Sequence, residues 1–248
     1  MSATPILEVQ AVSRNFGKFR ALSNISVAFA PGQLTAIIGP NGAGKSTFFN
    51  VISGGVPPSE GKVLFEGQDI TGIAPHEFAR RGIAKSFQIT NVFKRLSAHE
   101  NVRVALQMRV TRFEILRARA AYADLIAQAD ALLARVGLSP SRNQLAGDLA
   151  HGQQRSLEVA MALACEPKLL LMDEPTAGMS PEETTVMMKL ITQLAQERTV
   201  ILVEHKMKLV MGLCQRLIVL HHGELLADGP PEDIRANAEV KRVYLGQS

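Results

Sequence analysis

The sequence predicts an α/β fold built around a glycine-rich loop. An apolar run at 34–38 leads into glycine-rich residues 39–47, and apolar residues at helical spacing follow over 48–52. Two further apolar runs, at 169–173 and 199–203, have the length and composition of fully buried strands. Short buried strands separated by helical segments are typical of the α/β class.

The loop at 39–47 has the pattern Gly-x-x-x-x-Gly-Lys-Ser/Thr. Glycines allow backbone angles at which successive N–H groups point at phosphate oxygens, and the following helix adds its positive end. Lys45 supplies a charge for the terminal phosphates, and the Ser46 hydroxyl can ligate Mg²⁺. A glycine-rich turn that matches by chance is the alternative, but the flanking strand and helix favour a nucleoside triphosphate site. The residues expected to bind it are Gly39, Pro40, Asn41, Gly42, Ala43, Gly44, Lys45, Ser46 and Thr47.

Length and composition suit one large α/β domain, or one domain with an inserted lobe. The chain has 248 residues, of which 46% are hydrophobic and 20% charged. No uncharged stretch reaches the roughly 18 residues of a membrane-spanning helix, and the start lacks a signal-peptide pattern, so we expect a cytoplasmic protein. The net charge of +4 is modest, and with no Trp and two Tyr it argues for no nucleic-acid partner. Cys165 and Cys214 lie in apolar surroundings and are expected to be buried thiols rather than metal ligands or disulfide partners.

The first part of the chain is read as strands. Residues 6–12 and 25–29 are strand-like and are joined by an expected loop at 13–20, and another strand follows at 62–67. The loop carries two phenylalanines, one of them Phe16. Such a ring can stack on adenine near a nucleotide site, or it can simply belong to the core.

Helical segments are predicted for the middle of the chain. A strand at 82–88 ends on Gln88, whose alternative reading is a solvated strand end. Between 89 and 150 the composition shifts toward helix. Residues 97–100 have capping-box spacing before one helix, and an apolar face over 112–136 marks another.

Polar side chains lie at or just after the ends of the two predicted buried strands. The strand at 169–173 ends in Asp173, which suits Mg²⁺ binding, and is followed by Glu174, which could take a proton from an attacking water. Acidic pairs also occur at ordinary strand ends, and the phosphate loop upstream strengthens the catalytic reading. The strand at 199–203 leads to His205, which could contact a phosphate or cap the strand.

The remaining elements follow from local signals. Residues 149–163 begin with Leu-Ala-His-Gly-Gln and continue as a helix. Residues 180–183 combine an N-cap Ser, a proline at the first helical position and a capping-box Glu. Runs at 216–220 and 225–227 predict a hairpin, and a short helical tail is expected after it.

Taken in order, these pieces resemble an ATP-binding cassette (ABC) ATPase over essentially the whole chain. The family's phosphate loop, Q-loop, signature, Walker B and H-loop correspond to 39–47, Gln88, 149–153, 169–174 and His205. The resemblance implies a P-loop ABC ATPase core of α/β class, an inserted helical subdomain and a small antiparallel β subdomain. The expected boundaries are a single ABC domain at 6–240, a helical subdomain at about 89–160 and a short tail at 241–248.

The same resemblance implies ATP and Mg²⁺ as cofactors and assigns roles to single residues. Phe16 matches the adenine-stacking position, Glu174 the general base and His205 the γ-phosphate switch. Gln88 resembles the residue that ligates Mg²⁺ and water and also senses the membrane partner. The expected catalytic residues are Glu174, His205 and Gln88. The expected Mg²⁺ ligands are Ser46, Gln88 and Asp173.

Cassettes of this family pair so that each phosphate loop faces the other's signature. The resemblance therefore assigns Ala150, Gly152 and Gln153 to the partner's nucleotide. The common signature reads Leu-Ser-Gly-Gly-Gln, and here Ala150 and His151 replace the Ser and the first Gly. The lost hydroxyl would remove one contact to the opposite γ-phosphate, while Gly152 and the helix N-terminus can still serve. Ser180 occupies a position that usually holds Asp, and these departures bear on the support given to the partner's ATP site.

Among cassettes, the chain looks most like the branched-chain amino acid uptake ATPases. The segments that carry this likeness are 149–155, 173–181, 203–211 and 240–246. It implies transmembrane permeases, a second cassette of the same or a different kind, and indirectly a periplasmic or extracellular solute-binding protein. The expected location is cytoplasmic, on the inner face of the cell membrane.

Other readings of the chain stay open. Its tail also resembles the lipopolysaccharide-export cassette, and urea or amides are alternative solutes for an importer. A soluble cassette protein acting on ribosomes or DNA usually carries two cassettes or a long coiled-coil insertion, and the sequence has neither. A catalytically inert cassette is disfavoured because Lys45, Glu174 and His205 are all present.

Overall fold

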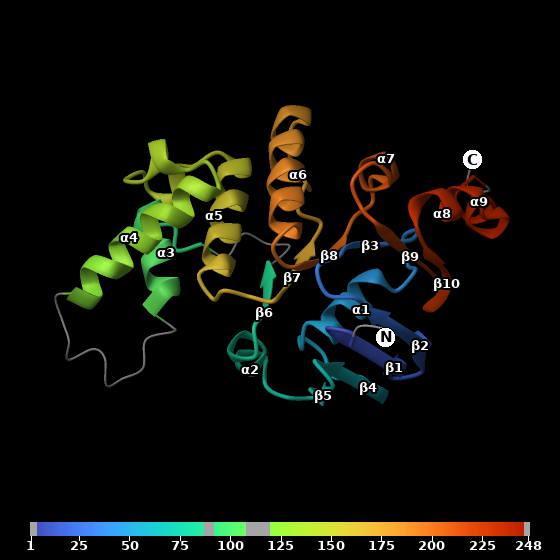
Figure 1. Ribbon diagram of the computed structural model, residues 1–248. Helices are drawn as coiled ribbons and strands as arrows, with labels where there is room; N and C mark the ends of the chain where they lie inside the picture. The colour runs from blue at the N-terminus through green and yellow to red at the C-terminus, as the bar shows by residue number, and fades with distance from the viewer. Residues whose placement is uncertain (1–3, 87–91, 108–119, 246–248) are drawn as a thin grey trace. The chain divides into compact units, whose positions relative to one another are not determined.

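A computed structural model describes residues 4–86, 92–107 and 120–245, which divide into two compact units (Figure 1). The first unit contains the chain up to 83, then 168–174, and everything from 191 onward. The second contains 84–167 and 175–190. The chain thus leaves the first unit twice, and the two segments outside it together form the second unit.

A small antiparallel sheet forms the N-terminal part of the first unit. Its order is β2–β1–β4–β5, and the strands are drawn in blue to teal in Figure 1. Their bounds are Leu7–Phe16 for β1, Phe19–Phe29 for β2, Glu60–Phe65 for β4 and Gln68–Asp69 for β5. The predicted loop at 13–20 is wrong, because both strands continue almost to the tip of the hairpin. Ser13 is only 1% exposed, and its hydroxyl accepts hydrogen bonds from Arg20 Nη2 (2.8 Å) and from the Asn24 N–H (3.1 Å).

The larger sheet supplies the buried centre of the first unit. Five of its strands belong there, in the order β10–β9–β3–β8–β7, and the sixth, β6 (Ile83–Ser86), begins at the last residue of the unit's first segment. β3 pairs in parallel with β8 and β9, β7 pairs in parallel with β8, and β9 and β10 form the predicted hairpin. Every residue of β3, β7 and β8 is buried, which explains why their sequences are mostly apolar. The bounds are Leu34–Ile38 for β3, Leu169–Asp173 for β7, Thr199–Val203 for β8, Arg216–His221 for β9 and Glu224–Gly229 for β10.

Helix α1 joins the two sheets into one core. It follows the phosphate loop and buries Phe48 and Phe49 completely, in a cluster with residues from both sheets. The unit's helices are α1 (Lys45–Ile52), α2 (Pro75–Arg80), α7 (Met207–Met211), α8 (Pro231–Ala236) and α9 (Ala238–Leu245). Within the described ranges, none of the chain's helices combines the length and apolar character needed to cross a membrane.

The second unit is largely helical. Its helices within the described residues are α3 (Ala98–Gln107), α4 (Ala120–Arg135), α5 (His151–Leu163) and most of α6 (Pro181–Ala195), with 3₁₀ turns at Ser139–Ser141 and Ala146–Asp148. The cap predicted at 97–100 is confirmed, because the Glu100 N–H donates to Ser97 Oγ at 3.1 Å. The first part of the helix predicted over 112–136 lies outside the described residues. The observed fold is the predicted one: an α/β core, a small antiparallel sheet and an inserted helical part.

Candidate functional site

The loop that begins after β3 is shaped by its glycines. Gly44 has φ +97°, a left-handed conformation that residues with a side chain rarely adopt, and it directly precedes α1. A Cβ at Gly44 would also lie 2.9 Å from the carbonyl oxygen of Ala21. Both constraints require glycine where the backbone turns into the helix, so that the first N–H groups of α1 face the loop.

Lys45 lies in this loop, and backbone carbonyl groups hold its ammonium. It is 5% exposed, and its Nζ donates hydrogen bonds to the carbonyl oxygens of Gly39 (2.8 Å) and Pro40 (2.9 Å). Burial lowers the pKa of Lys45, while the charges of Glu174 and Asp173 act in the opposite direction. The site therefore holds a largely desolvated ammonium beside two carboxylates.

A pocket of about 350 Å³ gathers the loop with residues from distant parts of the chain. Glu174 and His205 line it, although they follow different strands, β7 and β8. Phe19 of β2 lines another side. The loop's contribution consists of Asn41, Gly42, Ala43, Gly44, Lys45, Ser46 and Thr47.

Glu174 is held by the backbone and by His205. It follows the last residue of β7 with φ +45°, and its N–H donates to the carbonyl oxygen of Val203 at 3.0 Å. Its Oε1 is hydrogen-bonded to His205 Nε2, with the two side chains 18% and 44% exposed. A non-glycine residue in a left-handed conformation typically costs about 1–3 kcal/mol, and such residues cluster at functional sites.

Glu204 orients His205, although it was not among the predicted site residues. Glu204 is 3% exposed, and its Oε2 accepts a hydrogen bond from the His205 N–H at 3.1 Å. The Glu204 N–H donates to the Ile37 carbonyl oxygen at 3.3 Å, which ties this turn to β3. The sequence shows that Glu204 directly follows an apolar strand, but the burial of this carboxylate depends on the neighbouring strand.

The two phenylalanines of the hairpin occupy different surroundings. Phe16 is 47% exposed, and the guanidinium carbon of Arg14 lies 4.6 Å from its ring centroid. Phe19, its cross-strand partner, is 67% exposed and lines the pocket. The hairpin thus offers two exposed rings, of which only Phe16 was predicted to stack on adenine.

The other expected site residues are placed as follows. Asp173 ends β7, is 6% exposed and lies close enough to Lys45 for its charge to oppose the burial that lowers the pKa of that ammonium. Ala150, Gly152 and Gln153 lie at the start of α5 in the second unit. Gln88 lies outside the described residues.

The oxygen donors suit a divalent cation bound together with phosphates. The Ser46 hydroxyl belongs to a pocket-lining residue, and the Asp173 carboxylate is near enough to Lys45 to act on its charge. Carboxylate and hydroxyl oxygens are ligands that Mg²⁺ prefers, and it is usually bound by one or two carboxylates plus substrate phosphates and water. These residues therefore fit Mg²⁺ carried with a nucleotide.

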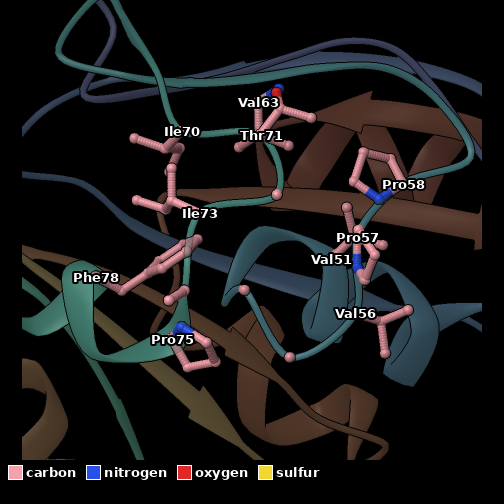
Figure 2. Close-up of a pocket in the computed structure, with 14 residues that line it drawn as sticks. Val51, Val56, Pro57, Pro58, Val63, Ile70, Thr71, Ile73, Pro75 and Phe78 are labelled. Carbon is pink, nitrogen blue, oxygen red and sulfur yellow. The ribbon is translucent and has the colours of Figure 1, made fainter.

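A second pocket of the first unit differs in its chemistry. It measures about 260 Å³ and lies beside the C-terminal end of α1, β4 and the start of α2, with Phe78 and Ile73 along one side (Figure 2). Its lining residues include no titratable side chain. The hydroxyl of Thr71, the one polar side chain among them, accepts a hydrogen bond from the Val63 N–H at 2.9 Å. This pocket offers apolar surface but no group for acid, base or phosphate chemistry.

The chain is similar along its length to known families and solved structures. Residues 22–177 match the family described as "ABC transporter", and residues 224–248 match "Branched-chain amino acid ATP-binding cassette transporter". A crystal structure titled as the ADP conformation of MJ1267, an ATP-binding cassette of an ABC transporter, is similar with a TM-score of 0.86 and 30% identity, covering 98% of this chain and all of that one. A dimeric post-hydrolysis cassette with ADP and Pi, MJ0796, is 26% identical with a TM-score of 0.78, covering 91% of this chain and 98% of that one.

Three curated relatives are similar over nearly their whole length. The high-affinity branched-chain amino acid transport ATP-binding protein BraF of Pseudomonas aeruginosa is 38% identical, covering 98% of this chain and 99% of the relative. LivG of Escherichia coli, with the same description, is 37% identical with the same coverage. The lipopolysaccharide export ATP-binding protein LptB of Haemophilus influenzae is 32% identical and covers 98% of both chains.

Proposed function

Because the chain belongs to the ATP-binding proteins of ABC transporters, we propose that it powers the uptake of branched-chain amino acids. The observation that carries this proposal is the family match over residues 224–248, whose description names branched-chain amino acid transporters. Relatives named for that transport, at 37% and 38% identity, support it. Lipopolysaccharide export is the second candidate, because one relative named for it is 32% identical over the same length.

The chain is an ATPase of the ABC type, and its own residues suggest how the phosphates are bound. Phosphate oxygens carry more negative charge than the carbonyls that Lys45 contacts in the structure, so they make stronger hydrogen bonds with its ammonium. The N–H groups at the start of α1 add further donors. We assign the triphosphate to residues 39–47, and the adenine to the exposed rings of Phe16 and Phe19.

We assign the general base to Glu174. Its Oε1 is engaged by His205, so Oε2 is the acceptor for a proton of the attacking water. The water oxygen bonds to the γ-phosphorus, and the bond from that phosphorus to the bridging oxygen of ADP breaks. His205 holds the carboxylate in place through its hydrogen bond to Oε1, and we assign it the role of the γ-phosphate switch.

Ser46 and Asp173 would hold Mg²⁺, with Gln88 as an expected further ligand outside the described residues. When bound, the ion withdraws negative charge from the phosphate oxygens and helps to orient them. Asp173 also places a negative charge near Lys45, which favours the protonated form of that lysine.

Cassettes of this family form dimers, and MJ0796 is one example. We propose that residues 150–153 of this chain complete the ATP site of a second cassette, identical or related. The pair would bind transmembrane permeases at the inner face of the cell membrane and, through them, respond to a solute-binding protein. We propose a single ABC domain at 6–240, with a helical subdomain at about 89–160 and a tail at 241–248.

The experiment is uptake of radiolabelled leucine by membrane vesicles that hold the chain with its co-purifying permeases and second cassette. We expect ATP-dependent uptake that rises with a leucine-loaded solute-binding protein. The matched control is Lys45→Ala, which removes the phosphate-binding charge and should abolish uptake and hydrolysis. Co-purification with no membrane protein, or stimulation by lipopolysaccharide instead of amino acids, would refute the proposal.

A further inference from the structure

Helix α5 begins without a side-chain cap of its own. Its N-cap residue is Ala150, which has no oxygen to accept a hydrogen bond from the first turn. Gln153 Oε1 accepts from the Ala150 N–H at 3.1 Å, so one half of a capping arrangement is present. The N–H of Gly152, at the second helical position, has to find its acceptor elsewhere.

Glu183, from the first turn of α6, supplies that acceptor. The Gly152 N–H donates to Glu183 Oε1 at 3.2 Å. A Cβ at position 152 would lie 2.6 Å from the same oxygen, so the approach depends on glycine there. A residue 31 positions along the chain thus caps the helix that carries the signature segment.

The same carboxylate also caps its own helix. Glu183 Oε2 accepts from the Ser180 N–H at 2.9 Å, and Ser180 Oγ accepts from the Glu183 N–H at 3.2 Å, which confirms the capping box predicted for 180–183. One oxygen of Glu183 therefore lies at the N-terminus of α5 and the other at that of α6. A negative charge is favourable at both positions, because helix N-termini carry partial positive charge.

A second link joins the same two segments. His151 Nε2 donates to the carbonyl oxygen of Ala177 at 3.1 Å. The ring also lies against Gly178, where a Cβ would come within 3.3 Å of Nε2. His151 and Glu183 thus connect 151–152 to both ends of 177–183, all within the second unit.

We propose that Glu183, assisted by His151, is a positioning residue that fixes the signature segment 150–153 relative to residues 177–183. The carboxylate replaces the cap that a Ser at position 150 would provide, and it thereby keeps Gly152 and Gln153 in helical geometry. This inference rests on the proposed function, in which 150–153 faces the nucleotide of a second cassette. It predicts that Glu183 affects the partner's ATP site without contacting this chain's own nucleotide.

The test compares Glu183→Ala and Glu183→Gln in the chain assembled with its permeases and second cassette. We expect kcat/KM for ATP to fall by roughly tenfold or more in Glu183→Ala, because hydrogen bonds to a charged group are lost at two helix N-termini. Glu183→Gln should give an intermediate loss, since one amide oxygen can accept from one of the two N–H groups. ATP affinity of the chain by itself should stay within about twofold of wild type in both variants, because residues 39–47 are intact.

The matched control is Glu182→Ala. It removes the same charge one residue away, and the Glu182 carboxylate accepts a hydrogen bond from Ser180 Oγ in its own segment. We expect wild-type kcat/KM for this control. Equal losses in Glu182→Ala and Glu183→Ala would show that charge alone matters, and this would overturn the proposal.

Other outcomes separate positioning from folding and from the proposed function. Wild-type turnover in Glu183→Ala would overturn the proposal. Turnover above wild type in Glu183→Gln would also overturn it, because it would mean that the carboxylate opposes the partner's phosphate. If ATP affinity of the lone chain falls in parallel with turnover, the role is structural and the proposal fails. If the wild-type assembly hydrolyses no ATP, the proposed function fails instead.

Discussion

Glu174→Gln tests the proposed chemistry with little change in shape. Gln can adopt the same left-handed backbone, its N–H can still donate to Val203, and its side-chain oxygen can still accept from His205 Nε2. What disappears is the negative charge and the basicity of the group. The variant therefore separates the base from the framework that holds it.

The expected magnitudes differ greatly between rate and stability. A general base contributes about 10²–10⁴ in rate, which is about 3–5 kcal/mol of activation free energy. The Glu174–His205 pair is partly exposed, with side-chain exposures of 18% and 44%, so its loss should change the free energy of unfolding by less than about 1 kcal/mol. ATP binding should persist, because Lys45 and the start of α1 are unchanged.

The assay measures Mg-ATP binding, turnover and association state of Glu174→Gln in parallel with wild type, at fixed salt. Glu60→Gln, an exposed change on β4, is the control for loss of a carboxylate. We expect the variant to bind ATP, hydrolyse it at least a hundredfold more slowly and accumulate as a closed dimer. Turnover at the wild-type rate would mean that another group is the base, and loss of ATP binding would mean that Glu174 holds the site together.

Three further predictions concern stability and reactivity. Burial raises the pKa of the Cys214 thiol to about 12, so iodoacetamide at pH 8 should alkylate Cys165 before Cys214, as followed by mass spectrometry; equal rates would contradict this. Hydrogen bonds from Arg142 lower the pKa of Asp130, so its stabilising effect is present above about pH 4 and is lost as pH falls through the lowered value. The difference in unfolding free energy between wild type and Asp130→Asn should therefore shrink below about pH 4 in urea titrations, and a constant difference would argue against it. Gly54 has φ +73° and a Cβ there would lie 2.3 Å from the Phe78 ring, so Gly54→Ala should lower the free energy of unfolding by about 1–3 kcal/mol, whereas Gly55→Ala should change it much less.

Features that depend on neighbouring residues in the sequence could be predicted. The strand at Thr199–Val203 has the predicted bounds, because a continuous apolar run determines both its length and its burial. The capping box at 180–183 was also predicted, because its two hydrogen bonds join residues three apart. The phosphate loop is recognisable for the same reason, since its pattern lies within nine consecutive residues.

Features that depend on distant residues could not be predicted in the same way. The polar stretch at 13–20 resembles a loop, yet Ser13 is buried because side-chain and backbone donors 7 and 11 residues away satisfy its hydroxyl. Helix α2 is only six residues long with one buried side chain, Phe78, so it has too little periodicity to detect. The hydrogen bond from the Gly152 N–H to Glu183 joins residues 31 apart, and no local sequence pattern predicts it.

The charged groups of the described pocket have hydrogen-bond partners within the protein. Lys45 donates to two carbonyl oxygens, and Glu174 shares a hydrogen bond with His205. ATP binding therefore exchanges hydrogen bonds, so the net gain is the difference between a phosphate and a carbonyl acceptor. A site that already satisfies its charges avoids leaving a buried ammonium or carboxylate without a partner after product release. This balance favours repeated binding and release, which a transport cycle requires.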